Sequence, residues 1–135
     1  MKNKDIITSG KRKSSKATAK ISDGTESITL NKISYTRLNN LKRLSIEEPV
    51  RITKELLGNF NFKIEVTMHG GGKESQIEAA RLAIARALVK FTKSEALRRA
   101  FISYDKALLI ADVRRKEAYK PGDSKARSKR QKSYR

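Results

Sequence analysis

Residues 61–69 read NFKIEVTMH, the clearest strand pattern in the chain. Phe62, Ile64, Val66 and Met68 point to one side of an extended backbone, and polar residues point to the other. Such alternation is typical of a strand in a sheet that has one covered face and one exposed face. We therefore predict a sheet that is covered on one side only.

The segment after this strand predicts the layer that covers it. Three glycines at residues 70–72 end the strand, and Ser75 with Glu78 forms a capping-box signature for a helix that runs to residue 91. At helical spacing, one stripe of that helix is apolar and contains Ile77, Ala80, Ile84, Ala87, Leu88 and Phe91. Because strand and helix each present an apolar face, we expect the two to pack together.

Weaker patterns flank this pair. They predict a β-hairpin over residues 16–31 around Asp23-Gly24, a short helix or turn over 34–44, a helix from Glu48-Pro49 to Gly58-Asn59, a short helix over 95–101 and a last strand over 107–113. Together these elements favour an α+β fold with helices on one face of the sheet. We expect a single domain over residues 1–113, whose basic N-terminal segment is 1–20 and whose first dozen residues are an extension. Residues 114–135 are expected to form an extended basic tail.

The charge of the chain is concentrated at its two ends. The 135 residues carry a formal net charge of +18. Residues 1–20 hold seven basic side chains against one acidic, and residues 114–135 hold ten against two. An excess of this size is usually neutralised by a polyanion. We favour nucleic acid over an anionic membrane surface, since neither basic end has an apolar face that could insert.

Other classes of function have little support in the residues. The absence of cysteine excludes disulfides and thiolate metal sites, and His69 is the only histidine, so we predict no metal and no cofactor. No stretch is typical of a signal peptide or a membrane span, and we expect a soluble intracellular protein without a membrane partner. The turn at residues 70–73 lacks P-loop spacing, which argues against a nucleotide enzyme and a small-molecule substrate. Its backbone N–H groups remain candidates for holding an RNA phosphate.

The last eleven residues, KARSKRQKSYR, are suited to contacts with RNA. Their basic side chains alternate at Lys125, Arg127 and Lys129, so an extended chain presents them on one side. Twenty-two extended residues span on the order of 70 Å, well beyond the radius of gyration of about 13 Å expected for the body. Arginine adds bidentate phosphate pairing, and Tyr134 is suited to stacking on a base. A free nucleic-acid-binding module, such as a DNA compactor or an RNA chaperone, and a phosphotransferase remain as alternatives.

Several segments resemble one family, that of the ninth protein of the small ribosomal subunit. The segments are GGGKESQIEAARLAIARAL at residues 70–88, SGKRKSSKATAKI at 9–21, LLIADVRRKE at 108–117 and RQKSYR at 130–135. The ending is similar to that of the archaeal and eukaryotic branch, whereas bacterial members typically finish in Ser-Lys-Arg. The resemblance covers residues 7–135.

The resemblance implies a fold, a location and a set of contacts. The fold has a left-handed βαβ crossover, and the location is the cytoplasmic ribosome, in the head of the small subunit beside neighbouring ribosomal proteins. The tail is expected to contact tRNA in the peptidyl site through Arg130, Lys132, Tyr134 and Arg135. The resemblance matches Lys11, Arg12, Lys13, Lys16, Arg114 and Arg115 to positions that face rRNA in the family. The charge pattern adds Lys125, Arg127 and Lys129 as expected rRNA contacts, and the glycine turn adds Gly70, Gly71, Gly72 and Lys73. It implies a structural protein and no enzymatic activity.

Overall fold

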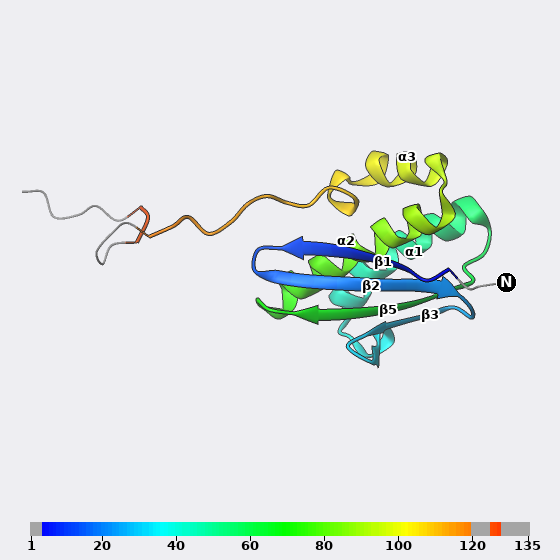
Figure 1. Ribbon diagram of the computed structural model, residues 1–135, viewed down its shortest axis with the longest axis horizontal. Helices are drawn as coiled ribbons and strands as arrows, with labels where there is room; N and C mark the ends of the chain where they lie inside the picture. The colour runs from blue at the N-terminus through cyan, green and yellow to red at the C-terminus, as the bar shows by residue number, and fades with distance from the viewer. Residues whose placement is uncertain (1–3, 120–124, 128–135) are drawn as a thin grey trace, which may run out of the picture.

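A computed structural model describes residues 4–119 and 125–127, and it contains a mixed sheet covered by helices (Figure 1). In the described part the strands are β1 (Ile6–Arg12), β2 (Ser15–Asp23), β3 (Ser27–Leu30), β4 (Ile33–Ser34) and β5 (Phe62–His69). The helices are α1 (Asn40–Leu57), α2 (Lys73–Thr92) and α3 (Glu95–Tyr104), with short 3₁₀ turns η1 (Tyr35–Arg37) and η2 (Lys106–Leu108). The predicted α+β class is confirmed. Among the described helices, none is long and apolar enough to cross a bilayer.

The predicted strand, β5, lies at the centre of the sheet, whose order is β1-β2-β5-β3-β4. β5 pairs antiparallel with β2 and parallel with β3, so that Ile64 lies between Ile21 on one side and Ile28 on the other. The chain passes from β3 to the parallel β5 by way of β4, η1 and α1.

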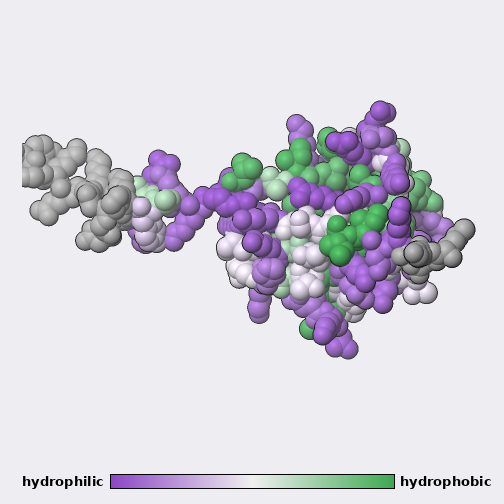
Figure 2. All heavy atoms as spheres, viewed as in Figure 1, coloured by the Kyte–Doolittle hydropathy of each residue, from purple (hydrophilic) through white to green (hydrophobic). Residues whose placement is uncertain are grey.

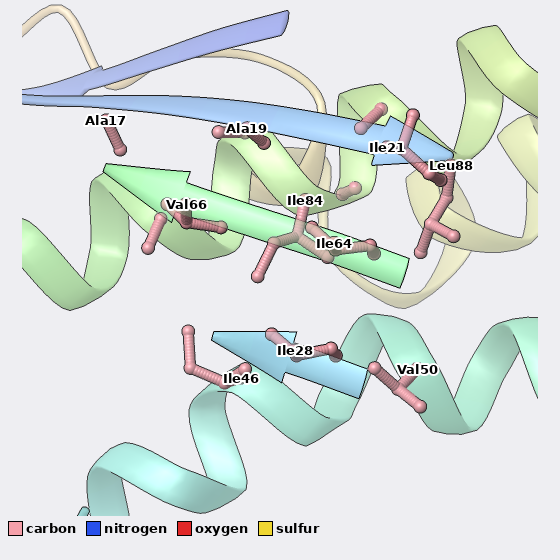
Figure 3. Packing of buried hydrophobic residues seen from close by; sticks show 14 of the residues in the cluster. Ala17, Ala19, Ile21, Ile28, Ile46, Val50, Ile64, Val66, Ile84 and Leu88 are labelled. Atoms are coloured by element: carbon pink, nitrogen blue, oxygen red, sulfur yellow. The ribbon is translucent and has the colours of Figure 1, made fainter. Parts of the chain in front are cut away.

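The core lies between one face of the sheet and the helices. The inward residues of β2 and β3 are buried, as are Ile64 and Val66 of β5, while Phe62 and Met68 are half-buried. Their neighbours along the strands are mostly exposed, as the alternation predicts. Figure 3 shows Ile84 and Leu88 of α2 on the β2–β5 side of this core, and Ile46 and Val50 of α1 beside β3. Burial of one such aliphatic side chain stabilises the fold by about 1.5–3 kcal/mol.

Helix α2 approaches the sheet unusually closely at β1. The helix buries five alanines, and the facing residue of the strand is Gly10. A Cβ atom placed on Gly10 would lie 2.8 Å from the backbone nitrogen of Ala83 and closer still to the carbonyl oxygen of Ala79. The hydroxyl of Thr8 donates a hydrogen bond to the Ala83 carbonyl at 2.9 Å. The small residues on both sides therefore set the distance between helix and strand.

Two predictions for the N-terminal half were wrong, namely the N-terminal extension and the hairpin around Asp23-Gly24. Residues 6–12 form a strand, not an extension, and they pair with β2 across a turn in which Lys13 has a φ of 52°. The segment around Asp23-Gly24 forms no hairpin, because β5 lies between β2 and β3 in the sheet. The physical reason is strand length. β2 and β5 have matching length and alternation and form eight residue pairs, whereas β3 has only four residues to pair with β2.

Several predicted helix ends and the last strand were also wrong. Helix α1 begins at Asn40, where the Asn39 side chain accepts from the Lys42 backbone N–H, and it carries the buried Pro49 inside it. Helix α2 begins two residues before Ser75. Helix α3 takes Ser94, not Thr92, as its N-cap. Residues 107–113 contain the end of η2 and an irregular extended segment, because the Asp105 side chain accepts from the Ala107 N–H and starts a 3₁₀ turn there.

Candidate nucleic-acid interface

Three segments that are far apart in the sequence meet at one end of the sheet. They are the basic turn between β1 and β2 (residues 11–16), the glycine turn between β5 and α2 (residues 70–73) and the start of the tail (residues 113–116) (Figure 1). An open groove of about 850 Å³ is lined by Lys11, Arg12, Lys13, Ser14, Arg114, Arg115 and Lys116. Figure 2 shows a mainly hydrophilic surface at this end of the body and along the start of the tail. The fold thus brings the basic turn of the N-terminal segment together with the base of the tail, whereas Lys20 lies toward the other end of the β1–β2 pair.

The glycine turn is shaped by contact with the basic turn. Gly70 and Gly71 have φ angles of 75° and 61°, a conformation that glycine adopts without strain. A Cβ on Gly70 would lie 2.7 Å from the carbonyl oxygen of Ser14. The buried Ser15 hydroxyl donates to the Gly70 carbonyl at 2.9 Å. These contacts hold the start of α2 beside the basic turn.

The start of α2 adds a positive end to this surface. The helix begins at Lys73, and no side chain among the described residues caps its first N–H groups. Such free N–H groups, together with the helix dipole, favour a negatively charged partner. Lys73 and Gly72 are both exposed. The predicted residues 70–73 therefore lie at the surface, next to the exposed side chains of the basic turn.

The cations of this end fall into two groups. The first group is exposed and consists of Lys11, Lys13, Lys16, Arg114 and Arg115. In this group Arg114 pairs with Asp112 at 2.7 Å, yet 78% of its side chain is exposed. Arg12 differs, because only 14% of its side chain is exposed. Its guanidinium lies 2.6 Å from Glu78 and 3.1 Å from Asp112. The lysines are available to an outside phosphate, whereas Arg12 is held by carboxylates of the protein itself.

The Arg114 contacts lower the pKa of Asp112 from 3.8 to about 2, because the Arg114 side chain and backbone N–H both donate to its carboxylate. A carboxylate with a depressed pKa stabilises the fold above its ordinary pKa, and this contribution is lost as the pH falls toward 2. We expect Arg114→Ala to raise the pKa of Asp112 toward 3.8 in a titration followed by carboxyl ¹³C NMR. Arg115→Ala is the control, since Arg115 donates to the Asp112 backbone carbonyl. An Asp112 midpoint that Arg114→Ala leaves unchanged would contradict this assignment.

The rest of the predicted site lies on the tail. Lys125 and Arg127 are exposed, and Arg127 pairs with Glu117 at 2.8 Å. The remaining predicted tail residues lie outside the described residues; they are Lys129, Arg130, Lys132, Tyr134 and Arg135.

Sequence reasoning missed two arginines of α2. Arg81 pairs with Glu48 of α1 and lies 3.3 Å from Asp105 at the end of α3, so it ties three helices together. Arg86 donates to two backbone carbonyls, those of Ser9 and Leu109. Helical spacing places Arg86 nearly opposite the apolar stripe, which predicts exposure to solvent. No local signal in the sequence reveals its carbonyl partners.

The fold and the clustered cations define a small basic α+β protein that presents one strongly positive end. Comparison with known proteins specifies the class further. The family model described as "Ribosomal protein S9/S16" matches residues 10–135. The "Small ribosomal subunit protein uS9" of Methanococcus vannielii is 38% identical over 98% of this chain and 99% of its own length. The protein of the same name from Methanococcus maripaludis strain C7 is 39% identical over the same shares.

The chain therefore belongs to the ribosomal protein S9/S16 family. This confirms the predicted family, and the archaeal relatives fit the predicted branch. It also confirms that the protein is a structural protein of the cytoplasmic ribosome rather than an enzyme.

Proposed function

We propose that this protein is a structural constituent of the head of the small ribosomal subunit, where it binds rRNA and supports tRNA in the peptidyl site. The observation that carries the proposal is that the basic turn between β1 and β2 and the first basic residues of the tail line one groove at one end of the sheet. In this proposal residues 1–113 form the body, and residues 114–135 form the tail that contacts RNA.

The body contributes the basic turn and the glycine turn. Exposed Lys11, Lys13 and Lys16 are suited to phosphate oxygens, and the uncapped start of α2 adds N–H donors next to them. Contacts of this kind fix the position and orientation of a protein on RNA without reading its sequence. We propose that this end of the body docks on the rRNA backbone.

The tail continues from the same end. Residues 113–119 leave the body as an extended chain (Figure 1). Arg114 and Arg115 begin a series of cations that continues through Lys125, Arg127 and Lys129, and we assign these to rRNA. We assign the last part of the tail to the tRNA, through Arg130, Lys132, Tyr134 and Arg135. Twenty-two extended residues span on the order of 70 Å, so the end of an extended tail can contact RNA far from the body.

Two further features follow the family resemblance. We expect the β3–α1–β5 crossover to be left-handed, and we expect neighbouring proteins of the small-subunit head to contact the body. The parallel pairing of β3 with β5, with α1 between them in sequence, supplies the βαβ unit to which the first expectation applies.

Removal of Arg135 tests the tRNA contact. We expect small subunits that carry the shortened protein to assemble largely as before but to retain peptidyl-site tRNA more weakly, because a terminal cation is lost from a phosphate contact. Filter binding of tRNA to reconstituted subunits measures the effect. Arg98→Ala on α3 is the matched control, since Arg98 is exposed and pairs only weakly with Glu95, at 3.8 Å. Equal tRNA retention with and without Arg135 would refute the contact.

A further inference from the structure

The segment that leads into the tail is tied to the body by an arginine of α2. This segment, residues 109–112, is called the tail stem below. The Nε of Arg86 donates to the carbonyl of Leu109 in the stem at 3.0 Å, and its Nη1 donates to the carbonyl of Ser9 in β1, also at 3.0 Å. One rigid guanidinium thus connects α2, the edge strand and the stem. A lysine could not reproduce this, because the geometry uses two donors of one planar group.

A second arginine ties down the other end of the stem. Arg12 at the end of β1 lies between Glu78 of α2 at 2.6 Å and Asp112 of the stem at 3.1 Å, and 27% of the Asp112 side chain is exposed. Asp112 also accepts from the backbone N–H of Arg114 at 2.9 Å, which constrains the backbone immediately after the stem. The stem is therefore hydrogen-bonded to the body at Leu109 and ion-paired with it at Asp112, and the chain direction is constrained just where the exposed tail begins.

We propose that Arg86, Arg12 and Asp112 form a clamp that fixes the direction in which the tail leaves the body. They are positioning residues. The clamp itself is a property of the free protein, and only its consequence for tRNA rests on the proposed function. When the tail is held fully extended, at a length on the order of 70 Å, a change of about 20° in its direction at the stem displaces its end by roughly 25 Å.

The burial of Arg12 supports this assignment over a phosphate contact. Its side chain is far less exposed than that of Arg114, and two carboxylates already neutralise its charge. An RNA phosphate would have to displace one of them to reach the guanidinium. Arg86 likewise donates two hydrogen bonds to backbone carbonyls within the protein.

Distance measurements on the free protein test the clamp directly. The chain has no cysteine, so cysteines introduced at Thr67 on the exposed face of β5 and at Lys116 on the tail give one defined pair of spin labels. In double electron–electron resonance we expect Arg86→Met and, separately, Asp112→Asn to broaden the distance distribution at least twofold relative to the unaltered clamp. Arg98→Met is the control and should leave the width unchanged. Asp112→Asn lies outside the helices, so it tests the clamp even if Arg86→Met does not fold.

Unchanged widths in the folded variants would overturn the clamp. Arg12→Met gives a second test, since loss of a phosphate contact would reduce the salt slope of RNA binding by about 0.7 unit, whereas loss of a clamp residue leaves the slope unchanged. A reduced slope with an unchanged distance distribution would assign Arg12 to RNA and overturn its role in the clamp. Broadened distances with unchanged tRNA retention in reconstituted subunits would support the clamp and overturn only its consequence for tRNA. The role of the tail at tRNA fails separately, if removal of Arg135 leaves tRNA retention unchanged.

Discussion

Deletion of residues 125–135 is expected to flatten the salt dependence of RNA binding by about 4 units of log affinity against log salt. The deleted segment holds Lys125, Arg127, Lys129, Arg130, Lys132 and Arg135. Each neutralised phosphate of a single strand contributes about 0.7 to the slope. Over a fourfold rise in salt concentration, the full chain should therefore lose roughly 300-fold more affinity than the deleted chain. Binding to an unpaired RNA strand of small-subunit sequence, on which all six cations can contact phosphates whichever RNA they face in the ribosome, is measured across a salt series and gives both slopes.

A matched variant separates charge from length in this experiment. A full-length chain with the six basic side chains replaced by glutamine keeps the length of the tail and loses its charge. It should show the same flattened slope as the deletion. A slope that neither variant changes would exclude the last eleven residues as an RNA contact.

Replacement of Gly10 by alanine is expected to destabilise the fold strongly. The added Cβ would overlap the backbone of α2 at Ala79 and Ala83, where neither neighbour is a flexible side chain that can move aside. Overpacking of this kind costs on the order of 3 kcal/mol. For a domain of about 100 residues this corresponds to a fall in Tm of about 12–24 °C. Thermal unfolding followed by circular dichroism measures it.

Gly24→Ala is the control for this prediction. A Cβ on Gly24 would meet only the Cβ of Lys63, at an ordinary contact distance of 3.4 Å. We expect a change in Tm of no more than a few degrees for this variant. If Gly10→Ala melts at the same temperature as Gly24→Ala, the close packing of α2 on β1 described above is wrong.

The sequence predicts the parts of the fold whose signal is local. The alternation from Phe62 to Met68 and the apolar stripe of α2 are each contained in one segment, and the structure pairs them as expected. The inward positions of β1, in contrast, are Ile6, Thr8 and Gly10. Two of these three carry little or no apolar surface, because α2 approaches too closely to leave room for it. The strand therefore lacks the pattern that would have revealed it.

Non-local pairing explains the other errors. Asp23-Gly24 is a strong local hairpin signal, but the insertion of β5 between β2 and β3 depends on residues about forty positions further along the chain. Proline is frequent at the first position of a helix, which favoured a start at Pro49. The helix instead begins after the N-cap Asn39, and the packing of its buried side chains keeps Pro49 inside it. Such competition between a local preference and tertiary packing is usually decided by the packing.

In the candidate site, too, the sequence predicts the features that depend on local residues and misses those that depend on distant partners. Charge counting and the family resemblance pointed to both basic ends of the sequence, and residues 11–13 of the first and 114–116 of the second line one groove at one end of the body. The sequence could not separate the exposed lysines of the basic turn from Arg12, because the carboxylates that hold Arg12 come from residues 78 and 112. The role of Arg86 was hidden for the same reason, since its partners are backbone carbonyls.

Crosslinking in intact particles tests the central claim most directly. A photoreactive side chain introduced at Arg127, which is 91% exposed, would be activated in small subunits that carry peptidyl-site tRNA, and the attached RNA would be sequenced. We expect small-subunit rRNA to be recovered from position 127, and tRNA to be recovered when the reactive group is moved to Arg135. Recovery of the protein in small-subunit fractions without RNA attached at either position would contradict the account.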